Sequence, residues 1–490
     1  AGVGDPDAVQ VRALAYEASL RAGERAKGLG APEIALRAFR DAAGLSDDEL
    51  EAARLLEQAA VMARTARRDE DAAELFRSAA AAHDAAGRAR DAVRLQGLGA
   101  SARIAEPVAA LAALREAYDI LAQGEPDAAY AEIALRLGRL TWMQGNVDAA
   151  TMTLLDNALA VGEALAMPDL VTNGLVTKGG FLQSQGRDIE AAALYTFALQ
   201  VALDAGDSPG ALDAYGNLTD SMLGSDRPGL VELATDGLAL ARRLGDRGSE
   251  QVLLSNIWLQ QIFTGDWSQV EATTAEAMAT GRNFGDVHAR LALLLAWRGD
   301  PAAAATHVEA LTDWLTGEDL QDRQIGQAAI AAVHLAGGRP AEAIELAGQV
   351  VDTFELGLRR ETFRVAWPTA VEASLELNRA EETDRLLAIV GDRPPGHVPP
   401  YLRAQLARFR ALRSAGLATD EAVEADHRAA VAAFSALGYP YWLARAQIDL
   451  GHWLANRGRD AEAGPLLSSG QEVLAQLGLS QVVRRADQHA

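Results

Sequence analysis

The sequence predicts an all-α fold, a right-handed superhelix of about twelve helical hairpins with a period of about 40 residues. Ala, Leu, Glu and Arg dominate, apolar residues recur at spacings of three and four, and β-branched runs are short and isolated. Gly, Asp and Pro interrupt this pattern at regular intervals. The chain has 490 residues, far more than one hydrophobic core of about 250–300 residues accommodates, so a repeat array is favoured.

Tight turns between paired helices define the repeat. We place them at Gly145, Gly186, Gly265, Gly299, Gly338, Asn378 and Gly458. Most neighbouring turns are separated by about one repeat period, and the two longest intervals, after Gly186 and after Asn378, are about twice that length and each hold two units. Glycine suits such turns because it adopts a left-handed backbone conformation without steric cost. Each hairpin then buries its apolar face against the next one.

The second helix of each hairpin has an expected start. In chain order these starts lie near Pro32, Glu70, Glu106, Asp148, Asp188, Pro228, Ser268, Pro301, Pro340, Ala380, Asp420 and Asp460. Proline at four of them fits the first turn of a helix, where the missing N–H would be unpaired anyway. The segment 391–400, "GDRPPGHVPP", is too rich in proline to be helical. We expect this linker to separate a solenoid body, 1–390, from C-terminal hairpins and a cap, 401–490.

Two stretches resemble the tetratricopeptide repeat, in which a bulky residue precedes Leu-Gly, a Gly turn and then an Ala. They are Leu137-Gly138…Gly145…Ala150 and Leu450-Gly451…Gly458…Ala463. The stretches 239–246 and 434–467 resemble the C-terminal repeat region of large bacterial signal-transduction ATPases, including nucleotide-cyclase fusions and LuxR-type regulators. The resemblance implies a sensor or partner-binding arm. The sequence does not begin with Met and has no phosphate-binding loop, so we expect it to be part of a longer protein.

Charge and composition exclude several classes of function. The formal net charge is −23 and no Lys/Arg cluster exceeds a short pair, so we expect no direct contact with nucleic acid. No apolar run of about 18 residues predicts a membrane span. The chain has no Cys, which excludes thiol catalysis and fits a reducing cytoplasm. We therefore predict a cytoplasmic protein and expect no cofactor.

No motif predicts catalysis or a metal site. "GDSPG", 206–210, matches a serine-hydrolase pattern, but a helix rather than a strand precedes it, so Asp207 or Ser208 is expected to cap the next helix. Glu424 and His427 share a helix face, but dimetal bundles need that spacing twice. We therefore expect a non-enzymatic protein.

The first helix of each tetratricopeptide unit lines the concave face, through side chains at fixed offsets before the turn. The candidate binding residues at such positions are Arg139, Trp142, Asn173, Gln183, Ser255, Leu259, Phe263, Leu293 and Trp297. Aromatic side chains often dominate recognition, which favours Trp142, Phe263 and Trp297 as anchors. The family's Lys, Asn and Arg set for a peptide C-terminal carboxylate is not present. In the alternative interpretation, a tightly wound superhelix buries its own inner wall.

The predicted function is a protein-interaction and regulatory module of a bacterial signalling or transcription-regulating protein, with a protein or peptide partner in the concave groove. The alternative is a sensor that holds a small-molecule inducer in the lumen of the superhelix. A closed, polar-lined pocket would favour the sensor, and an open groove would favour the interaction module. The sequence does not indicate an oligomeric state.

Overall fold

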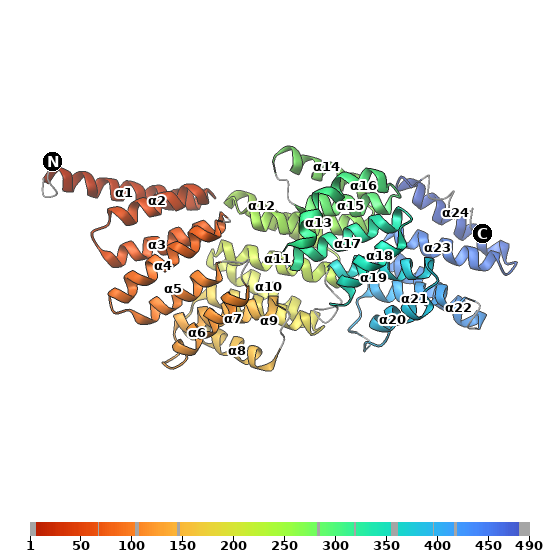
Figure 1. The fold of residues 1–490 in the computed structure, drawn as a ribbon, viewed down its shortest axis with the longest axis horizontal. Helices are drawn as coiled ribbons and strands as arrows, with labels where there is room; N and C mark the ends of the chain where they lie inside the picture. The colour runs from red at the N-terminus through yellow and green to blue at the C-terminus, as the bar shows by residue number, and fades with distance from the viewer. Residues whose placement is uncertain are drawn as a thin grey trace. The chain divides into compact units, whose positions relative to one another are not determined.

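The computed structural model describes residues 6–66, 68–102, 107–144, 148–281, 285–317, 320–353, 361–394, 396–415 and 419–479. These residues form twenty-four α-helices and one short 3-10 helix, with no strand among them (Figure 1). The prediction of an all-α repeat fold is confirmed. The described residues form twelve tetratricopeptide-like helical hairpins of a solenoid.

The first twelve helices are α1 (Pro6–Gly28), α2 (Pro32–Leu45), α3 (Glu49–Thr65), α4 (Asp69–Ala85), α5 (Ala89–Ser101), α6 (Pro107–Leu121), α7 (Ala128–Met143), α8 (Ala149–Ala164), α9 (Pro168–Ser184), α10 (Asp188–Ala205), α11 (Ser208–Gly224) and α12 (Leu230–Leu244). The rest are α13 (Arg247–Thr264), α14 (Trp267–Ala279), α15 (Gly285–Trp297), α16 (Pro301–Ala310), η1 (Thr312–Thr316), α17 (Leu320–Ala336), α18 (Pro340–Val351), α19 (Glu361–Glu376), α20 (Ala380–Gly391), α21 (Pro400–Ser414), α22 (Asp420–Leu437), α23 (Pro440–Ala455) and α24 (Asp460–Gln476). Every even-numbered helix begins at its predicted start or close beside it.

The turn residues explain this agreement. Left-handed backbone angles occur at Gly186, Gly265, Gly299, Gly338, Asn378 and Gly458, with φ between 53° and 85°. Gly145 lies outside the described residues. Asp226 also turns the chain with φ of 57°, between α11 and α12, where the sequence pattern did not identify a turn residue. These angles are accessible to Gly at no cost and to Asn or Asp at little cost, so the turns are specified locally.

Small residues let the two helices of a hairpin approach closely. A Cβ atom on Gly138 of α7 would lie 2.5 Å from Leu155 of α8, and one on Gly451 of α23 would lie 2.7 Å from Leu467 of α24. Neither separation is sterically possible without movement. The repeated Leu-Gly of the sequence therefore marks the closest contact between paired helices, which is why so sparse a pattern recurs.

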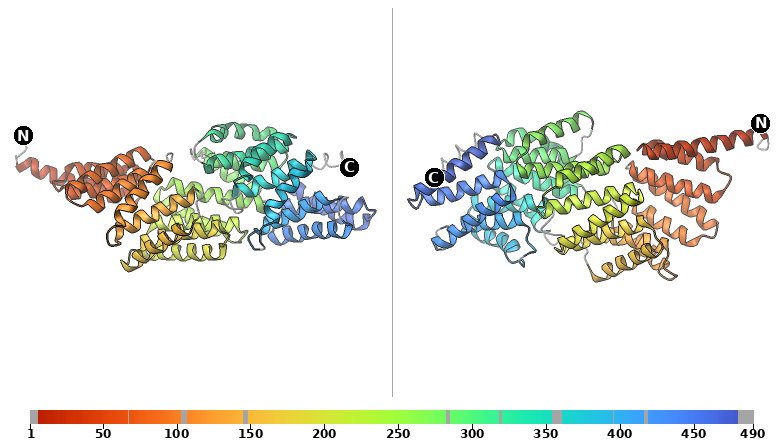
Figure 2. Two further views of the ribbon diagram at one scale, coloured as in Figure 1. Left: turned by 60° about the horizontal axis from the view of Figure 1, so that its bottom comes forward. Right: turned by 180° about the vertical axis from the view of Figure 1, so that it is seen from behind.

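The hairpins form two layers. Odd-numbered helices pack on the odd-numbered helices of neighbouring hairpins, as in α5 on α7, α7 on α9, and α17 on α19. Among the described residues, no two even-numbered helices make comparable contact. In a curved stack of hairpins, the layer in which the helices lie closer together is on the concave side. The odd-numbered helices therefore form the inner face, and Figure 2 shows successive hairpins stacked side by side within each part of the chain.

The chain divides into two compact units. The first comprises residues 1–219 and 232–254, and the second comprises 220–231 and 255–490. The proline-rich segment 391–400 lies inside the second unit, between the end of α20 and the start of α21. The separation of 1–390 from 401–490 at this segment stays a prediction.

Candidate functional site

Charged side chains line the inner face of the first unit. Arg94 of α5 lies between Glu57 of α3 and Glu132 of α7, and its Nη1 is 2.8 Å from Glu57 Oε1 and 2.9 Å from Glu132 Oε2. The three residues are 37 and 38 positions apart, so one inward-facing position carries alternating charges on successive hairpins. Burial opposes the charge of Arg94, but the two glutamates outweigh it and raise the pKa of the guanidinium.

A second ion pair reaches across a whole hairpin. Arg139 of α7 binds Asp213 of α11 through both guanidinium nitrogens, with Nη2 2.8 Å from Oδ1. Asn217 donates to the same carboxylate at 3.2 Å. Burial raises the pKa of Asp213, but the charge and hydrogen bonds of Arg139 outweigh it and hold the pKa below its usual range. The bridge joins odd-numbered helices on either side of α9, and the odd-numbered layer forms the inner face.

Two arginines near these groups form no ion pair within the described residues. The side chain of Arg64 of α3 makes no hydrogen bond there, and that of Arg136 of α7 makes one, from Nε to Ser101 Oγ at 3.2 Å. Burial and the charges of Arg64 and Arg139 lower the pKa of Arg136 to about 9, against the opposing charges of Glu132 and Asp213. Burial is also the main cause of the lowered pKa of Arg64, and the charge of Glu132 opposes it.

The other candidate residues of the first unit lie beside this cluster. Trp142 packs on Gly180 of α9, where a Cβ atom would lie 2.5 Å from the indole ring, and its Nε1 donates to Ser184 Oγ at 2.8 Å. Gln183 Oε1 accepts from the Tyr195 hydroxyl at 3.0 Å. Asn173 of α9 is partly exposed, and its Oδ1 accepts from Thr177 at 3.3 Å.

The candidates of the second unit have a different environment. Ser255, Leu259, Phe263, Leu293 and Trp297 are all buried. Phe263 packs edge-on against Tyr401 of α21, with ring centroids 4.9 Å apart, and Trp297 stacks on Tyr441 of α23 at 5.1 Å. Ser255 accepts a hydrogen bond from Arg290. These residues therefore fit the alternative interpretation, in which a tightly wound superhelix buries its own inner wall.

A buried ion pair contacts these packed aromatic side chains. Asp226 and Arg364 of α19 are both fully buried, and Arg364 Nη2 lies 2.6 Å from Asp226 Oδ1. The Tyr439 hydroxyl and the Tyr401 backbone N–H also donate to this carboxylate, each at 2.8 Å. The guanidinium lies 4.9 Å from the Phe263 ring centroid and 4.8 Å from that of Tyr401. Side chains as far apart in the sequence as Asp226 and Tyr439 therefore meet in one core.

Four charged residues near the predicted site were not expected from the sequence, namely Arg64, Arg94, Arg136 and Asp213. Asp213 had a usable signal, because it precedes the turn at Asp226 by the same offset that separates Asn173 from its turn at Gly186. Arg94 had another, in its regular spacing from Glu57 and Glu132. Arg64 and Arg136 had none, since the charges that surround them come from several helices of the folded chain.

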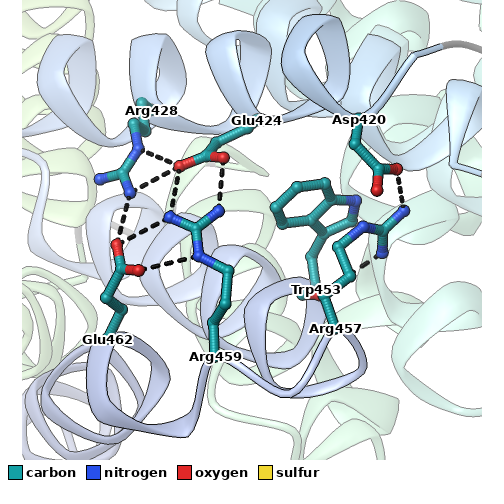
Figure 3. A network of polar contacts seen from close by, with 7 residues as sticks. All are labelled: Asp420, Glu424, Arg428, Trp453, Arg457, Arg459 and Glu462. Atoms are coloured by element: carbon teal, nitrogen blue, oxygen red, sulfur yellow. Dashed lines mark hydrogen bonds and ion pairs between the residues drawn. The ribbon is translucent and has the colours of Figure 1, made fainter.

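The pair Glu424 and His427 has a structural role. Glu424 accepts from Arg459 at 2.6 Å and from Arg428 at 2.8 Å, in a surface network that joins α22 to α24 (Figure 3). In the same network Arg457 covers the Trp453 ring at 3.9 Å. His427 is buried 6.1 Å from that ring. Among the described residues, no three His, Asp or Glu side chains are placed to hold a metal ion.

Comparisons with known proteins concern the fold. No protein-family profile matches the sequence, and no curated protein is similar to it. Similar solved structures include the Cut9–Hcn1 hetero-tetramer of the APC/C (11% identity, 94% of this chain and 87% of that chain, TM-score 0.49). A Rap protein complexed with competence and sporulation factor is also similar (11% identity, 79% and 98%, TM-score 0.44).

A third similar structure is a signal transduction ATPase with a tetratricopeptide repeat sensor from Pyrococcus horikoshii (13% identity, TM-score 0.45). The alignment covers 78% of this chain and 56% of that chain. The chain resembles the tetratricopeptide solenoids of such proteins. At these identities the similarity describes the fold alone.

No helix in the described part of the chain combines the length and the apolar character that crossing a bilayer needs.

Proposed function

We propose that this chain is a non-enzymatic binding module of a regulatory protein, and that a protein or peptide segment binds along the inner face of the first unit. The observation that supports the proposal is the contrast between the two inner faces. In the second unit aromatic side chains fill much of this face, as with Trp297 and Tyr441. In the first unit the same layer carries charged side chains that keep access to solvent, such as Arg139 and Asp213, which are 25% and 28% exposed.

Arg139, Trp142, Asn173 and Gln183 are the proposed contact residues. They come from α7 and α9, and the close packing of these two helices supports the proposal that the four residues share one surface. Trp142 offers an aromatic face beside polar groups, the combination that dominates many binding surfaces. Asn173 offers an amide, which can pair with the backbone of an extended peptide.

A substitution that blocks the groove tests the proposal. Asn173→Arg introduces a long cation at the centre of the surface, and Gln200→Arg introduces the same cation on the exposed side of α10 as a matched control. The probe is a random hexapeptide library, acetylated and amidated at its ends, presented to the immobilised chain. We expect Asn173→Arg to lower the captured amount at least about tenfold, which corresponds to about 1.4 kcal/mol, and Gln200→Arg to leave it unchanged.

Hydrogen exchange locates the captured peptides. We expect added protection on α7, α9 and α11. Equal capture by wild type and Asn173→Arg, or protection confined to even-numbered helices, would contradict the proposal. Native mass spectrometry of the gently purified chain addresses the alternative, because a retained adduct below about a kilodalton would instead indicate a small-molecule sensor.

A further inference from the structure

The two ends of the first unit touch each other. The turn between α1 and α2 meets the turn between α12 and α13, and Figures 1 and 2 show this end of α1 and α2 next to α12. A Cβ atom on Gly30 would overlap the carbonyl group of Leu244, and one on Gly245 would overlap the carbonyl oxygen of Gly30. Both turns belong to the first unit. The stack of hairpins from α1 to α12 therefore closes on itself.

Close approach of the two turns explains why glycine occupies both positions. Gly30 and Gly245 have left-handed angles, with φ of 66° and 65°. Ala166, between α8 and α9, turns the chain with φ of 50°, so a left-handed angle alone does not exclude a side chain in this unit. Gly87 and Gly206 have φ of 72° and 69°, and a Cβ atom on either would meet nothing within 4 Å. The opposite backbone is thus what excludes a side chain from the two contacting turns.

This contact has few sources of stability. The backbone N–H of Gly30 donates to the Lys27 carbonyl at 3.2 Å. That of Gly245 donates to the Arg242 carbonyl at 3.3 Å, so both donors are used within their own turns. The side chain of Leu29, next to the contact, is 65% exposed. Since hydrophobic stabilisation scales with the apolar area buried, and the two glycines have no side chain to bury, they contribute little to it.

The second unit closes in a different way. The turn between α13 and α14 meets the start of α23, because a Cβ atom on Gly265 would lie 2.6 Å from Pro440. Beside this contact the buried rings of Phe263 and Tyr439 pack with centroids 5.2 Å apart. Buried aromatic rings stabilise such a closure through their large apolar area. The closing contact of the first unit has glycine backbone in the corresponding place.

We propose that the contact of Gly30 with Leu244 and Gly245 is a reversible clasp, which closes the first unit around its inner face and opens to admit a bound segment. A contact that gains little free energy leaves the open state populated. Opening keeps the ion pairs of Arg94 and Arg139, which join α3, α5, α7 and α11 but involve neither α1 nor α12. The admission of a segment rests on the proposed function; the clasp itself does not.

Spin labels test the clasp. The chain has no Cys, so Lys27→Cys combined with Arg243→Cys places two labels at exposed positions near the two turns and nowhere else. Pulsed electron paramagnetic resonance measures the distance between the labels. We expect a short distance in most molecules and a longer one in a minority. Adding Gly245→Ala should raise the ratio of long to short distances at least about tenfold, because the new methyl group overlaps the opposite turn.

The matched control is Gly206→Ala, which strains a turn with nearly the same φ but meets no opposite backbone. It should leave the distances unchanged. Gly30→Ala opens the clasp from the other side and repeats the test if Gly245→Ala does not fold. A single short distance that neither contact variant alters, or an equal effect of Gly206→Ala, would overturn the inference.

A cross-link tests the admission of a segment. The Lys27→Cys/Arg243→Cys chain is linked with a flexible bismaleimide, and its control is the same variant with both thiols capped by N-ethylmaleimide. The probe is the acetylated, amidated hexapeptide library. We expect the linked chain to capture peptides at least about tenfold more slowly than the capped chain, because its inner face is reached only through the two openings of the closed stack.

The two proposals fail separately. Label distances that respond to Gly245→Ala, without capture of peptides by any form of the chain, would leave the clasp and remove the peptide groove. Capture that depends on Asn173 and proceeds at equal rates in the linked and the capped chain would leave the groove and remove the role of the clasp in admission.

Discussion

The buried pair Asp226–Arg364 provides a stringent test of how the second unit is held together. Asp226→Asn keeps the size of the side chain and, since Asn tolerates left-handed angles, also the turn with φ of 57°. The change removes the charge that compensates Arg364, whose side chain is fully buried. Breaking a buried pair in this way costs about 3–5 kcal/mol, because the remaining charge has no access to water.

The expected shift follows from the size of the unit. For a domain of about 150–250 residues, each kcal/mol lowers the melting temperature by about 2–4 °C, so Asp226→Asn should lower it by about 6–20 °C. Tryptophan fluorescence reports this unit selectively, because seven of the eight tryptophans, all except Trp142, lie in its residue ranges.

Two variants complete the experiment. Asp384→Asn makes the same charge change in a surface pair with Arg413, where Asp384 is 58% exposed, and should cost less than about 1 kcal/mol. Asp226→Asn combined with Arg364→Met leaves no uncompensated charge and should recover much of the loss. A melting temperature of Asp226→Asn within about 2 °C of wild type, or a double variant no more stable than the single one, would refute the reasoning.

Two further predictions concern the second unit. Trp297→Ala should destabilise it by about 3–5 kcal/mol, measured by thermal unfolding, since the ring is buried between Phe263 and Tyr441; a stable variant would show that the ring is not a core residue. His288 and His307 face each other with 3.0 Å between their Nδ1 atoms, and burial lowers the pKa of both, with the charge of His288 lowering that of His307 further. A histidine whose pKa is lower in the folded chain than in the unfolded chain contributes to stability above the unfolded pKa of about 6.5, and this contribution is lost as the pH falls below that value. The melting temperature should therefore drop between about pH 7.5 and 5.5. Changing both residues to Gln should flatten that drop.

The hairpins were predictable because their signals are local. A glycine at a left-handed turn, a proline at a helix start and a Leu-Gly at the closest helix contact each act within a few residues, as Gly458, Pro340 and Gly451 illustrate. Counting from such turns also predicts that Arg139 and Asn173 lie on the inner face. These inferences need only the backbone conformation and the helical period.

The state of the inner face was not predictable in the same way. Whether Phe263 is an exposed anchor or a core residue depends on Tyr401 and Tyr439, which are far away in the sequence. Which charges lie near Arg64, those of Glu132, Arg139 and Asp69, is likewise a property of the folded chain. A pattern with a period of about 40 residues shows which side chains point inward, but not what they meet there.

The bridge between Arg139 and Asp213 gives the first unit a mechanical property. It connects α7 to α11, which are two hairpins apart, on the concave side of the stack. Straightening the stack of helices at α9 requires the ion pair between Arg139 and Asp213 to break, whereas increasing the curvature of the stack does not. We therefore expect the first unit to resist straightening at α9 more than it resists further bending.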